Sequence, residues 1–361
     1  MAVKKPDFTR QLLEWHKKEN TREMPWKGEK DPYKIWLSEV ILQQTRVEQG
    51  WAYYTRFLEA FPTIQDLARA PEQKIFKLWE GLGYYSRCRN LIATAKKVVS
   101  DHGGKFPSLY ADIRELKGVG PYTAAAIASF AFNLPYAVVD GNVVRVLSRY
   151  LGRFTPIDTT AGKKEYAELA DSLLDRDQPG TYNQAIMDFG AVICKPQNPL
   201  CPTCIQRTNC QALQEGWVTQ LPVKEKSIQK KNRWLIYFIV ETPDEKVYIR
   251  QRTGKDIWED LFEFVCWETD KEVYPEEVLR SDFARQLFGK QSLTLKHISK
   301  IYRQELSHQT IRGQFVTIRL EKPLPASKGY LPVPKQNLSE YAFPKFINAW
   351  LLDPTPVQNL F

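Results

Sequence analysis

The sequence predicts a chain of two domains, a mostly α-helical domain followed by an α+β domain. At 361 residues the chain is long enough for two separate hydrophobic cores. Apolar residues recur at spacings of three and four up to about residue 215, which indicates helices. From about residue 234 the pattern changes to runs of β-branched and aromatic residues separated by turn residues, which indicates strands.

The helices of the first domain are expected in the segments 10–18, 35–61, 72–83, 89–103 and 163–175, with Gly or Pro breaks at 61–71 and 102–109. The strands of the second domain are expected at 233–242, 245–252, 261–268 and 313–321, with one helix at 274–289. Residues 222–233 are polar, with five basic residues against one acidic, and are expected to form a linker. This linker either lies close to phosphates of a partner or is only a connector exposed to solvent. We therefore expect domains at 1–221 and 234–350 and a tail at 351–361.

The composition indicates the class of partner. The net charge of +9 favours a polyanion, and ten tryptophans provide rings on which bases can stack. The N-terminus has no apolar core of a signal peptide, and the longest apolar stretch, 124–139, is interrupted by Asn133 and Pro135. We therefore expect a soluble, cytoplasmic protein without a membrane segment, in which six cysteines favour metal binding over disulfides.

The stretch LKGVGPYTAAA, residues 116–126, predicts a phosphate-binding turn. Gly118 and Gly120 can adopt backbone angles closed to other residues, with Val119 between them, and Pro121 suits the first position of a helix. The N–H groups at such a helix start can bind a phosphate oxygen, as in a helix-hairpin-helix motif that binds the DNA backbone. The alternative is an ordinary turn between two helices, but the whole motif favours DNA.

Two carboxylates are candidates for chemistry. Asp140 precedes apolar residues at helical spacing, so Asp140 or Asn142 is expected at a helix start. It is either a helix cap or a carboxylate held near a reacting sugar, with Asn142 orienting it. Glu39 shares a predicted helix face with apolar and aromatic residues, which raises the pKa of a carboxyl group and can keep it protonated as a general acid. A satisfied core glutamate is the alternative.

Four cysteines, Cys194, Cys201, Cys204 and Cys210, lie within seventeen residues at the spacing C-x6-C-x2-C-x5-C. Zinc sites usually show two close pairs, and only one is present here. A single [4Fe–4S] cluster held by four cysteines fits the spacing better. The spacing alone leaves zinc open.

Together these motifs resemble the helix-hairpin-helix DNA glycosylases with an iron–sulfur loop, and within them the MutY family of adenine DNA glycosylases. The resemblance covers essentially the whole chain and is carried by SEVILQQTRV, GLGYYSRCRNL, LKGVGPYTAAA, VVDGNVVRVLSR and the four cysteines. It implies a [4Fe–4S] cluster in the loop 194–210 and a Nudix-like fold for 234–350. The related endonuclease III has a lysine where this chain has Tyr122, and tyrosine cannot form a Schiff base, so the resemblance implies a monofunctional enzyme.

The implied activity is removal of adenine paired with 8-oxoguanine or, more weakly, with guanine in double-stranded DNA. Glu39 matches the general acid, Asp140 the carboxylate that stabilises the oxocarbenium ion, and Tyr122 and Asn142 support Asp140. The wall of the base pocket is matched by Arg22, Met24 and Trp26, with Gln184 at its edge. Gln44 and Tyr84 match residues that fill and wedge the duplex. We expect a monomer, associated with the nucleoid if the source is bacterial.

The second domain resembles the 8-oxoguanine-recognising domain of this family. The Nudix hydrolase signature is absent from the sequence, so pyrophosphate hydrolysis is not expected. The family's Phe-Ser-His loop reads Leu306-Ser307-His308 here, so the polar pair is retained and the aromatic contact is lost. An exposed loop without a binding role is the alternative. Rival functions are a bifunctional pyrimidine glycosylase with lyase activity and a non-catalytic iron–sulfur DNA-binding protein.

Overall fold

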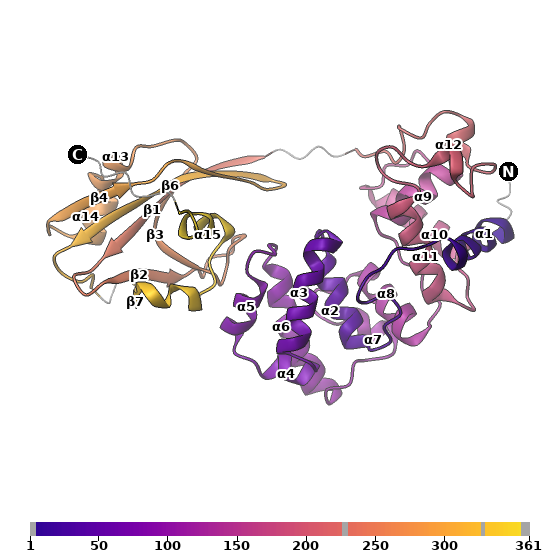
Figure 1. Ribbon diagram of the computed structural model, residues 1–361, viewed down its shortest axis with the longest axis horizontal. Coiled ribbons are helices and arrows are strands. Elements are labelled where there is room, and N and C mark those ends of the chain that lie inside the picture. Colours follow the sequence, from indigo (N-terminus) through magenta and orange to yellow (C-terminus); the bar gives the residue numbers. More distant parts are fainter. Residues whose placement is uncertain (1–4, 226–229, 326–328, 355–361) are drawn as a thin grey trace. The chain divides into compact units, whose positions relative to one another are not determined.

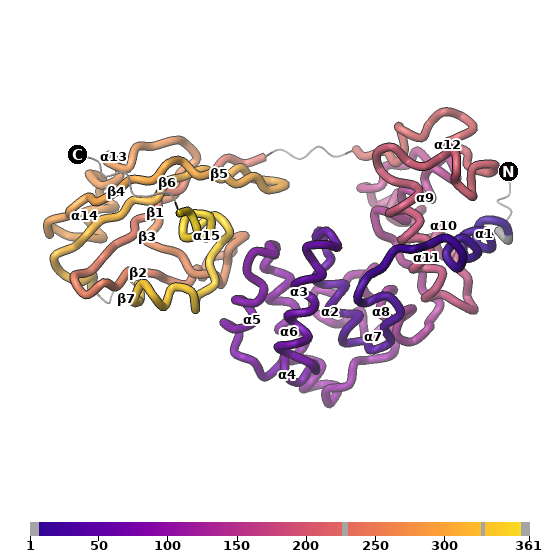
Figure 2. Tube along the Cα trace, viewed as in Figure 1, coloured from indigo at the N-terminus to yellow at the C-terminus, as the bar shows by residue number. Residues whose placement is uncertain are grey.

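The computed structural model describes residues 5–225, 230–325 and 329–354, and the chain divides into two compact units (Figures 1 and 2). The helical unit comprises residues 1–70 and 89–226, and the sheet unit comprises 71–88 and 227–361. Of the expected linker and tail, residues 226–229 and 355–361 lie outside the described residues. The predicted combination of a mostly α domain and a domain of mixed α and β structure is confirmed. No helix in the described part of the chain is long and apolar enough to cross a membrane.

The helical unit is built from short helices with defined caps. Asp31 caps α2 by accepting a hydrogen bond from the Tyr33 backbone N–H, and Asp140 caps α9 in the same manner through Val143. The helices of this unit are α1 (Lys5–Lys18), α2 (Pro32–Leu42), α3 (Val47–Ala60), α4 (Ile64–Arg69), α6 (Ser86–His102, whose first residues belong to the sheet unit), α7 (Tyr110–Arg114), α8 (Pro121–Phe132), α9 (Gly141–Leu151), α10 (Thr160–Leu173), α11 (Pro179–Val192), α12 (Gln211–Gln214) and the 3-10 helix Cys201–Thr203.

Two sequence expectations in this unit were wrong in detail. The segment 35–61 is two helices, α2 and α3, because the chain turns at residues 43–46, where Gln44 has a φ of 57°. The expected break at 61–71 contains α4, because Thr63 and Asp66 form a reciprocal capping box that starts a helix. The breaks at 102–109 and before Pro121 agree with the structure.

One hydrophobic core packs α1, α9 and α11 together, and α9 and α11 carry residues of the candidate site. Phe8 and Trp15 of α1 pack with Leu147 of α9 and Phe189 of α11, all nearly inaccessible to solvent. Ring contacts join Phe8 to Tyr150 and Trp15 to Phe189. This packing fixes the start of α9, where Asp140 lies, relative to α11.

The sheet unit contains a mixed sheet with seven strands among the described residues. Its order is β4-β6-β1-β3-β2-β7, β5 pairs with β6, and β1 and β6 run parallel while the other pairs are antiparallel. The strands are β1 (Lys231–Glu241), β2 (Lys246–Gln251), β3 (Phe262–Thr269), β4 (Leu293–Ile298), β5 (Tyr302–Glu305), β6 (Gln309–Leu320) and β7 (Leu331–Pro334). The helices are α5 (Glu72–Trp79), α13 (Pro275–Leu279), α14 (Asp282–Phe288), α15 (Lys345–Leu351) and the 3-10 helix Lys335–Glu340.

Helices cover both faces of this sheet. Phe238 of β1 packs with Phe288 of α14 on one face, whereas Tyr237 and Phe315 pack with Phe346 of α15 on the other. Seven consecutive residues of β1 are therefore buried, as is typical of a strand covered on both sides. The four predicted strands are confirmed as β1, β2, β3 and β6, and the predicted helix 274–289 is divided into α13 and α14.

Candidate active site and cysteine loop

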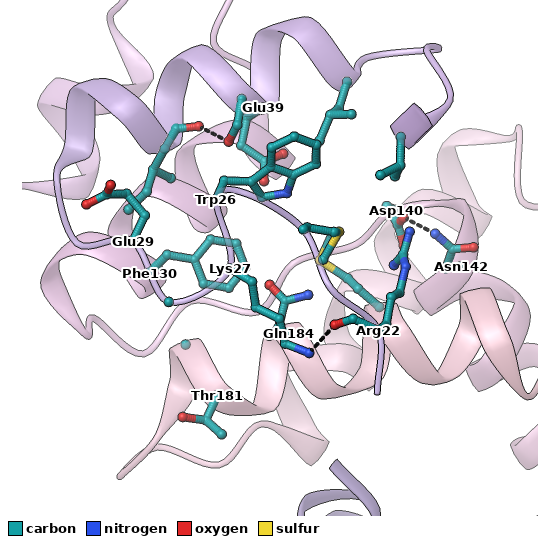
Figure 3. Close-up of a pocket in the computed structure, with 18 of the residues that line it drawn as sticks. Arg22, Trp26, Lys27, Glu29, Glu39, Phe130, Asp140, Asn142, Thr181 and Gln184 are labelled. Atoms are coloured by element: carbon teal, nitrogen blue, oxygen red, sulfur yellow. Dashed lines mark hydrogen bonds between the residues drawn. The ribbon is translucent and has the colours of Figure 1, made fainter. Parts of the chain in front are cut away.

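A cavity of about 410 Å³ opens in the helical unit between the segment before α2 and the helices α2, α8, α9 and α11. Figure 3 shows its side chains converging from α2 on one side and α11 on the other. The eight residues expected for catalysis and base binding all line it: Arg22, Met24, Trp26, Glu39, Tyr122, Asp140, Asn142 and Gln184. The fold thus brings together residues that are up to 162 positions apart in the chain, from Arg22 to Gln184. Their individual roles remain predictions.

Glu39 is a buried carboxyl group on α2. It is 6% exposed, and burial raises its pKa from 4.5 to about 7. The Tyr122 hydroxyl donates a hydrogen bond to it, which lowers the pKa, and the charge of Asp140 raises the pKa further. The carboxyl group can therefore hold or release a proton near neutral pH, as a general acid must.

Asp140 is both a helix cap and part of the cavity. Its Oδ1 accepts from the Val143 backbone N–H at 2.8 Å, and its Oδ2 accepts from the Asn142 side chain at 2.7 Å. Burial raises the pKa of Asp140, while these two donors and the nearby Arg145 lower it. The two alternatives from the sequence are compatible, since the cap fixes the carboxylate where it faces the cavity.

Tyr122 lies in the first turn of α8 beside both carboxyl groups. Burial, followed by the charges of Glu39 and Asp140, raises the pKa of its hydroxyl well above 10. The hydroxyl therefore stays protonated and acts as a hydrogen-bond donor.

Asp188 of α11 was not predicted from the sequence, although it organises the polar end of the cavity. Its carboxylate is fully buried and accepts hydrogen bonds from Arg22 at 2.8 Å, Gln184 at 3.0 Å and Asn20 at 2.8 Å. The Lys27 ammonium lies 3.4 Å away. Asp188 is the single acidic residue of α11 and lies one turn after Gln184, and this was the available signal.

Arg145 is a second residue that sequence reasoning missed. It is 8% exposed, and its guanidinium donates to the Asn142 side chain at 2.9 Å and to the Cys194 carbonyl at 2.8 Å. Because Asn142 donates in turn to Asp140, a continuous path of hydrogen bonds joins the first cysteine of the loop to the cavity.

In the turn between α7 and α8, the expectation of a backbone conformation closed to other residues is confirmed for Gly118 and wrong for Gly120. Gly118 has a φ of +78°, and an added Cβ would lie 2.7 Å from the Asn90 side chain. Gly120 is the N-cap of α8 with a φ of −79°, a conformation open to any residue, and no atom lies within 4 Å of its added Cβ. Val119 between them is buried.

The two residues expected to fill or wedge the duplex both have left-handed backbones, at 57° for Gln44 and 49° for Tyr84. Such conformations are uncommon for residues other than glycine and gather at functional sites. Gln44 lies in the turn after α2. In the sheet unit, the exposed Tyr84 ring has its hydroxyl 3.4 Å from Ser307 Oγ, and Ser307 Oγ lies 3.2 Å from His308 Nδ1.

The four cysteines of the loop line one small, mostly apolar cavity of about 30 Å³. None forms a disulfide. Arg149 beside them donates to Cys194 Sγ at 3.5 Å and to the Lys195 carbonyl at 2.8 Å. Within the described ranges no three His, Cys, Asp or Glu side chains are grouped to hold a metal ion. Outside this set Cys88 is fully buried, as expected, whereas Cys266 is only half-buried.

Each of the two units matches a known protein family. Residues 37–173 match the family described as HhH-GPD superfamily base excision DNA repair protein, and residues 236–352 match the NUDIX domain. The adenine DNA glycosylase of Buchnera aphidicola from Schizaphis graminum is 35% identical over 73% of this chain and 75% of its own length. That of Buchnera from Baizongia pistaciae is 33% identical over 84% of each chain, and the human enzyme is 43% identical over 59% of this chain and 41% of its own.

Solved structures share the fold of the helical unit. A thermostable thymine-DNA glycosylase superposes with a TM-score of 0.55 at 31% identity, over 58% of this chain and 97% of its own. Endonuclease III in a non-covalent DNA complex superposes with a TM-score of 0.51 at 23% identity, over 60% and 99%.

Proposed function

The chain belongs to the adenine DNA glycosylase family, and from that premise we propose that it hydrolyses adenine from mispairs with 8-oxoguanine or guanine and leaves an abasic site. It is an N-glycosylase of base excision repair, as its relatives indicate. The observation that supports the proposed chemistry most is the pairing of Glu39, whose pKa is about 7, with Asp140 in one cavity. Two carboxyl groups in different environments can act as acid and as electrostatic stabiliser.

Base flipping gives the target atom access to this pocket. An adenine rotated out of the duplex enters the cavity, at a cost of a few kcal/mol that is smaller at a mispair. The indole of Trp26 offers an aromatic face, and Gln184 and Arg22, both held by Asp188, offer donors and acceptors to the base edge. The Asp188 contacts fix these side chains before the base arrives, which lowers the entropic cost of binding.

The reaction breaks the bond between adenine N9 and the sugar C1′. The Glu39 carboxyl proton passes to adenine N7, so the base leaves as a neutral species. The Asp140 carboxylate stabilises the positive charge that develops on the sugar, and Asn142 and the start of α9 hold it in place. Water then adds to C1′, with ionised Glu39 accepting its proton. Because Tyr122 has no amine, no Schiff base forms there and the DNA strand stays intact.

The sheet unit supplies recognition of the opposite base. We assign Ser307 and His308 to contact with 8-oxoguanine, and Leu306 contributes an aliphatic contact instead of an aromatic ring. The turn at Gly118, Val119 and Gly120 binds a phosphate of the backbone, while Gln44 and Tyr84 fill the space that adenine vacates. Double-stranded DNA is thus the partner of a monomeric enzyme.

The four loop cysteines suit a [4Fe–4S] cluster better than a single zinc ion. Zinc sites of this kind usually show two close pairs of ligands, whereas this loop has one close pair, Cys201 and Cys204. The four thiols line one cavity, which is the donor set of a cluster held by four cysteines. Cys194, Cys201, Cys204 and Cys210 would hold the cluster, which would cross-link the loop and supply no step of the hydrolysis. About four irons per chain are expected after anaerobic purification, and one zinc without iron would refute this.

Single-turnover excision on duplexes containing 8-oxoguanine:A, G:A or thymine glycol tests the proposed function. We expect adenine release that is fastest opposite 8-oxoguanine, with strand breaks only after alkali. Release of thymine glycol with strand cleavage would favour the bifunctional alternative, and binding without release of any base would favour the non-catalytic one.

A further inference from the structure

The hairpin between β5 and β6 presents its tip, Leu306-Ser307-His308, from the sheet unit. Ser307 and His308 are exposed, and the contacts of Ser307 Oγ with Tyr84 and His308 are long and open to solvent, so they hold the tip weakly. The backbone closes the turn with a hydrogen bond from Leu306 N–H to the Gln309 carbonyl at 2.8 Å. Whatever holds Gln309, the first residue after the tip, therefore influences how the tip points.

Arg233 of β1 holds Gln309 through its side chain. Its guanidinium donates to Gln309 Oε1 at 3.1 Å and, in pairs, to the carboxylates of Asp256 and Glu268 at 2.7 to 3.0 Å. The Arg233 side chain is only 11% exposed and lies over the Trp258 ring. The planar fork of an arginine can satisfy three acceptors at once, which a lysine ammonium cannot do with the same geometry.

The contact between Arg233 and Gln309 lies where the parallel pairing of β1 and β6 begins. Lys231 is paired with Gln309, and its N–H donates to the His308 carbonyl at 3.0 Å. Residues at the end of a strand fray when only backbone bonds hold them. Arg233 adds a buried anchor there, because its carboxylate partners come from β3 and from the segment that follows β2.

The side-chain contacts of Glu305, on the other side of the tip, are weaker. Glu305 accepts from Arg303 at 2.6 Å, Lys230 at 3.0 Å and Thr310 at 2.9 Å. Both of its cationic partners are about half exposed or more, so salt screens these pairs and each contributes little. Arg233, at 11% exposure, is better shielded from solvent than these partners of Glu305, so its contact with Gln309 holds the tip more firmly.

We propose that Arg233 is a positioning residue that sets the preference for 8-oxoguanine by holding Gln309, and thereby Ser307 and His308, in the recognising conformation. This inference rests on the proposed function of the tip. Arg233 itself touches neither the lesion nor the reacting sugar; it acts through the hairpin. The predicted consequence is specific, since a displaced tip weakens recognition of 8-oxoguanine and leaves adenine chemistry in the other unit intact.

The test compares single-turnover excision on 8-oxoguanine:A and G:A duplexes for Arg233→Gln and Gln309→Leu. We expect the ratio of the two rates to fall about tenfold in each variant, which corresponds to about 1.4 kcal/mol, with the G:A rate unchanged. Gln309→Glu keeps the acceptor and should keep the ratio. Gln309 is half-buried, so its variants keep the test valid if Arg233→Gln fails to fold.

The matched control is Arg252→Gln. Arg252 belongs to the same ionic group, but its carboxylate partners are Asp256 and Glu263, and in the described part of the chain its ion pairs do not include Gln309. It should lower thermal stability without changing the rate ratio. If wild-type protein prefers 8-oxoguanine:A and the preference survives both Arg233→Gln and Gln309→Leu, the assignment of Arg233 is overturned while the proposed function stands. Equal wild-type rates on the two duplexes would overturn both.

Discussion

At the scale of single residues, the proposed role of the buried Glu39 carboxyl group as general acid predicts how the excision rate depends on pH. A general acid works only while protonated, and the protonated fraction of Glu39 falls as the pH rises through about 7. We therefore expect the single-turnover rate to decline above this pH. Glu39→Gln keeps the shape but has no proton to give, so the rate should fall by roughly 10²–10⁴ while duplex affinity changes little. Excision near the wild-type rate in this variant would refute the assignment.

The same group makes a prediction about stability. The pKa of Glu39 is about 7 in the folded protein, against an ordinary value of 4.5 for an exposed glutamate, so its ionisation is harder in the folded state than in the unfolded state. The contribution of Glu39 to the free energy of unfolding is fully present below pH 4.5. It is lost as the pH rises through 7. Relative to wild type, Glu39→Gln should gain about 2–3 kcal/mol between pH 5 and pH 8. Denaturant unfolding at both pH values measures this, and a constant difference would contradict it.

Tyr122 is the position at which the proposed hydrolysis can be tested against lyase chemistry. It lines the cavity with Glu39 and Asp140, from the first turn of α8. A lysine there would be desolvated and close to the positive end of the helix, and both effects lower its pKa and favour the neutral amine that attacks a sugar. Tyr122→Lys should therefore introduce strand cleavage and a covalent adduct trapped by borohydride. Efficient trapping by the unmodified protein would instead mean that another lysine acts, and Lys27 in the cavity and Lys117 in the turn are the ones to test.

At the scale of elements, the turn before α8 distinguishes two glycines that look equivalent in sequence. Gly118→Ala places a Cβ in a left-handed conformation and against Asn90, so it should destabilise the protein by at least 1–2 kcal/mol. Gly120→Ala meets neither obstacle and should fold normally. If DNA approaches the backbone at Gly120, that variant should lose duplex affinity at unchanged thermal stability. Equal melting temperatures for the two variants would contradict the distinction.

Local signals explain which elements could be predicted from the sequence. Strands β1, β2, β3 and β6 have buried β-branched and aromatic runs, whereas β4 and β5 contain no fully buried residue, so no apolar run reveals them. Helix α4 was missed because its capping box lies within a stretch that Pro62 and Pro71 make look like a break. Glu39, Asp140 and Asn142 were indicated by the residue pattern itself, and the other cavity residues by motif resemblance. Asp188 and Arg145 were not, because their importance comes from partners that only folding brings close.

At the scale of the whole molecule, the cysteine loop and the candidate active site belong to one hydrogen-bonded system in the helical unit. Arg145 joins the Cys194 carbonyl to Asn142, and Asn142 orients Asp140. Arg149, also buried, contacts the same loop through Cys194, Lys195 and Pro196 but does not reach the cavity. The two arginines thus offer a matched comparison between supporting the loop and positioning Asp140, the proposed catalytic carboxylate.

Arg145→Lys keeps a positive charge but cannot bridge all of its acceptors, so Asn142 loses a partner and Asp140 loses its fixed orientation. We expect the excision rate at saturating protein to fall by about tenfold or more, while iron content and duplex affinity stay close to wild type. Arg149→Lys should show the opposite pattern, with lower iron content or melting temperature and a normal rate for the folded fraction. The two variants need iron analysis, thermal unfolding and single-turnover excision on the same preparations. Equal loss of rate and iron in both would mean that the arginines only stabilise the loop, and that the path from Cys194 to Asp140 has no separate effect on catalysis.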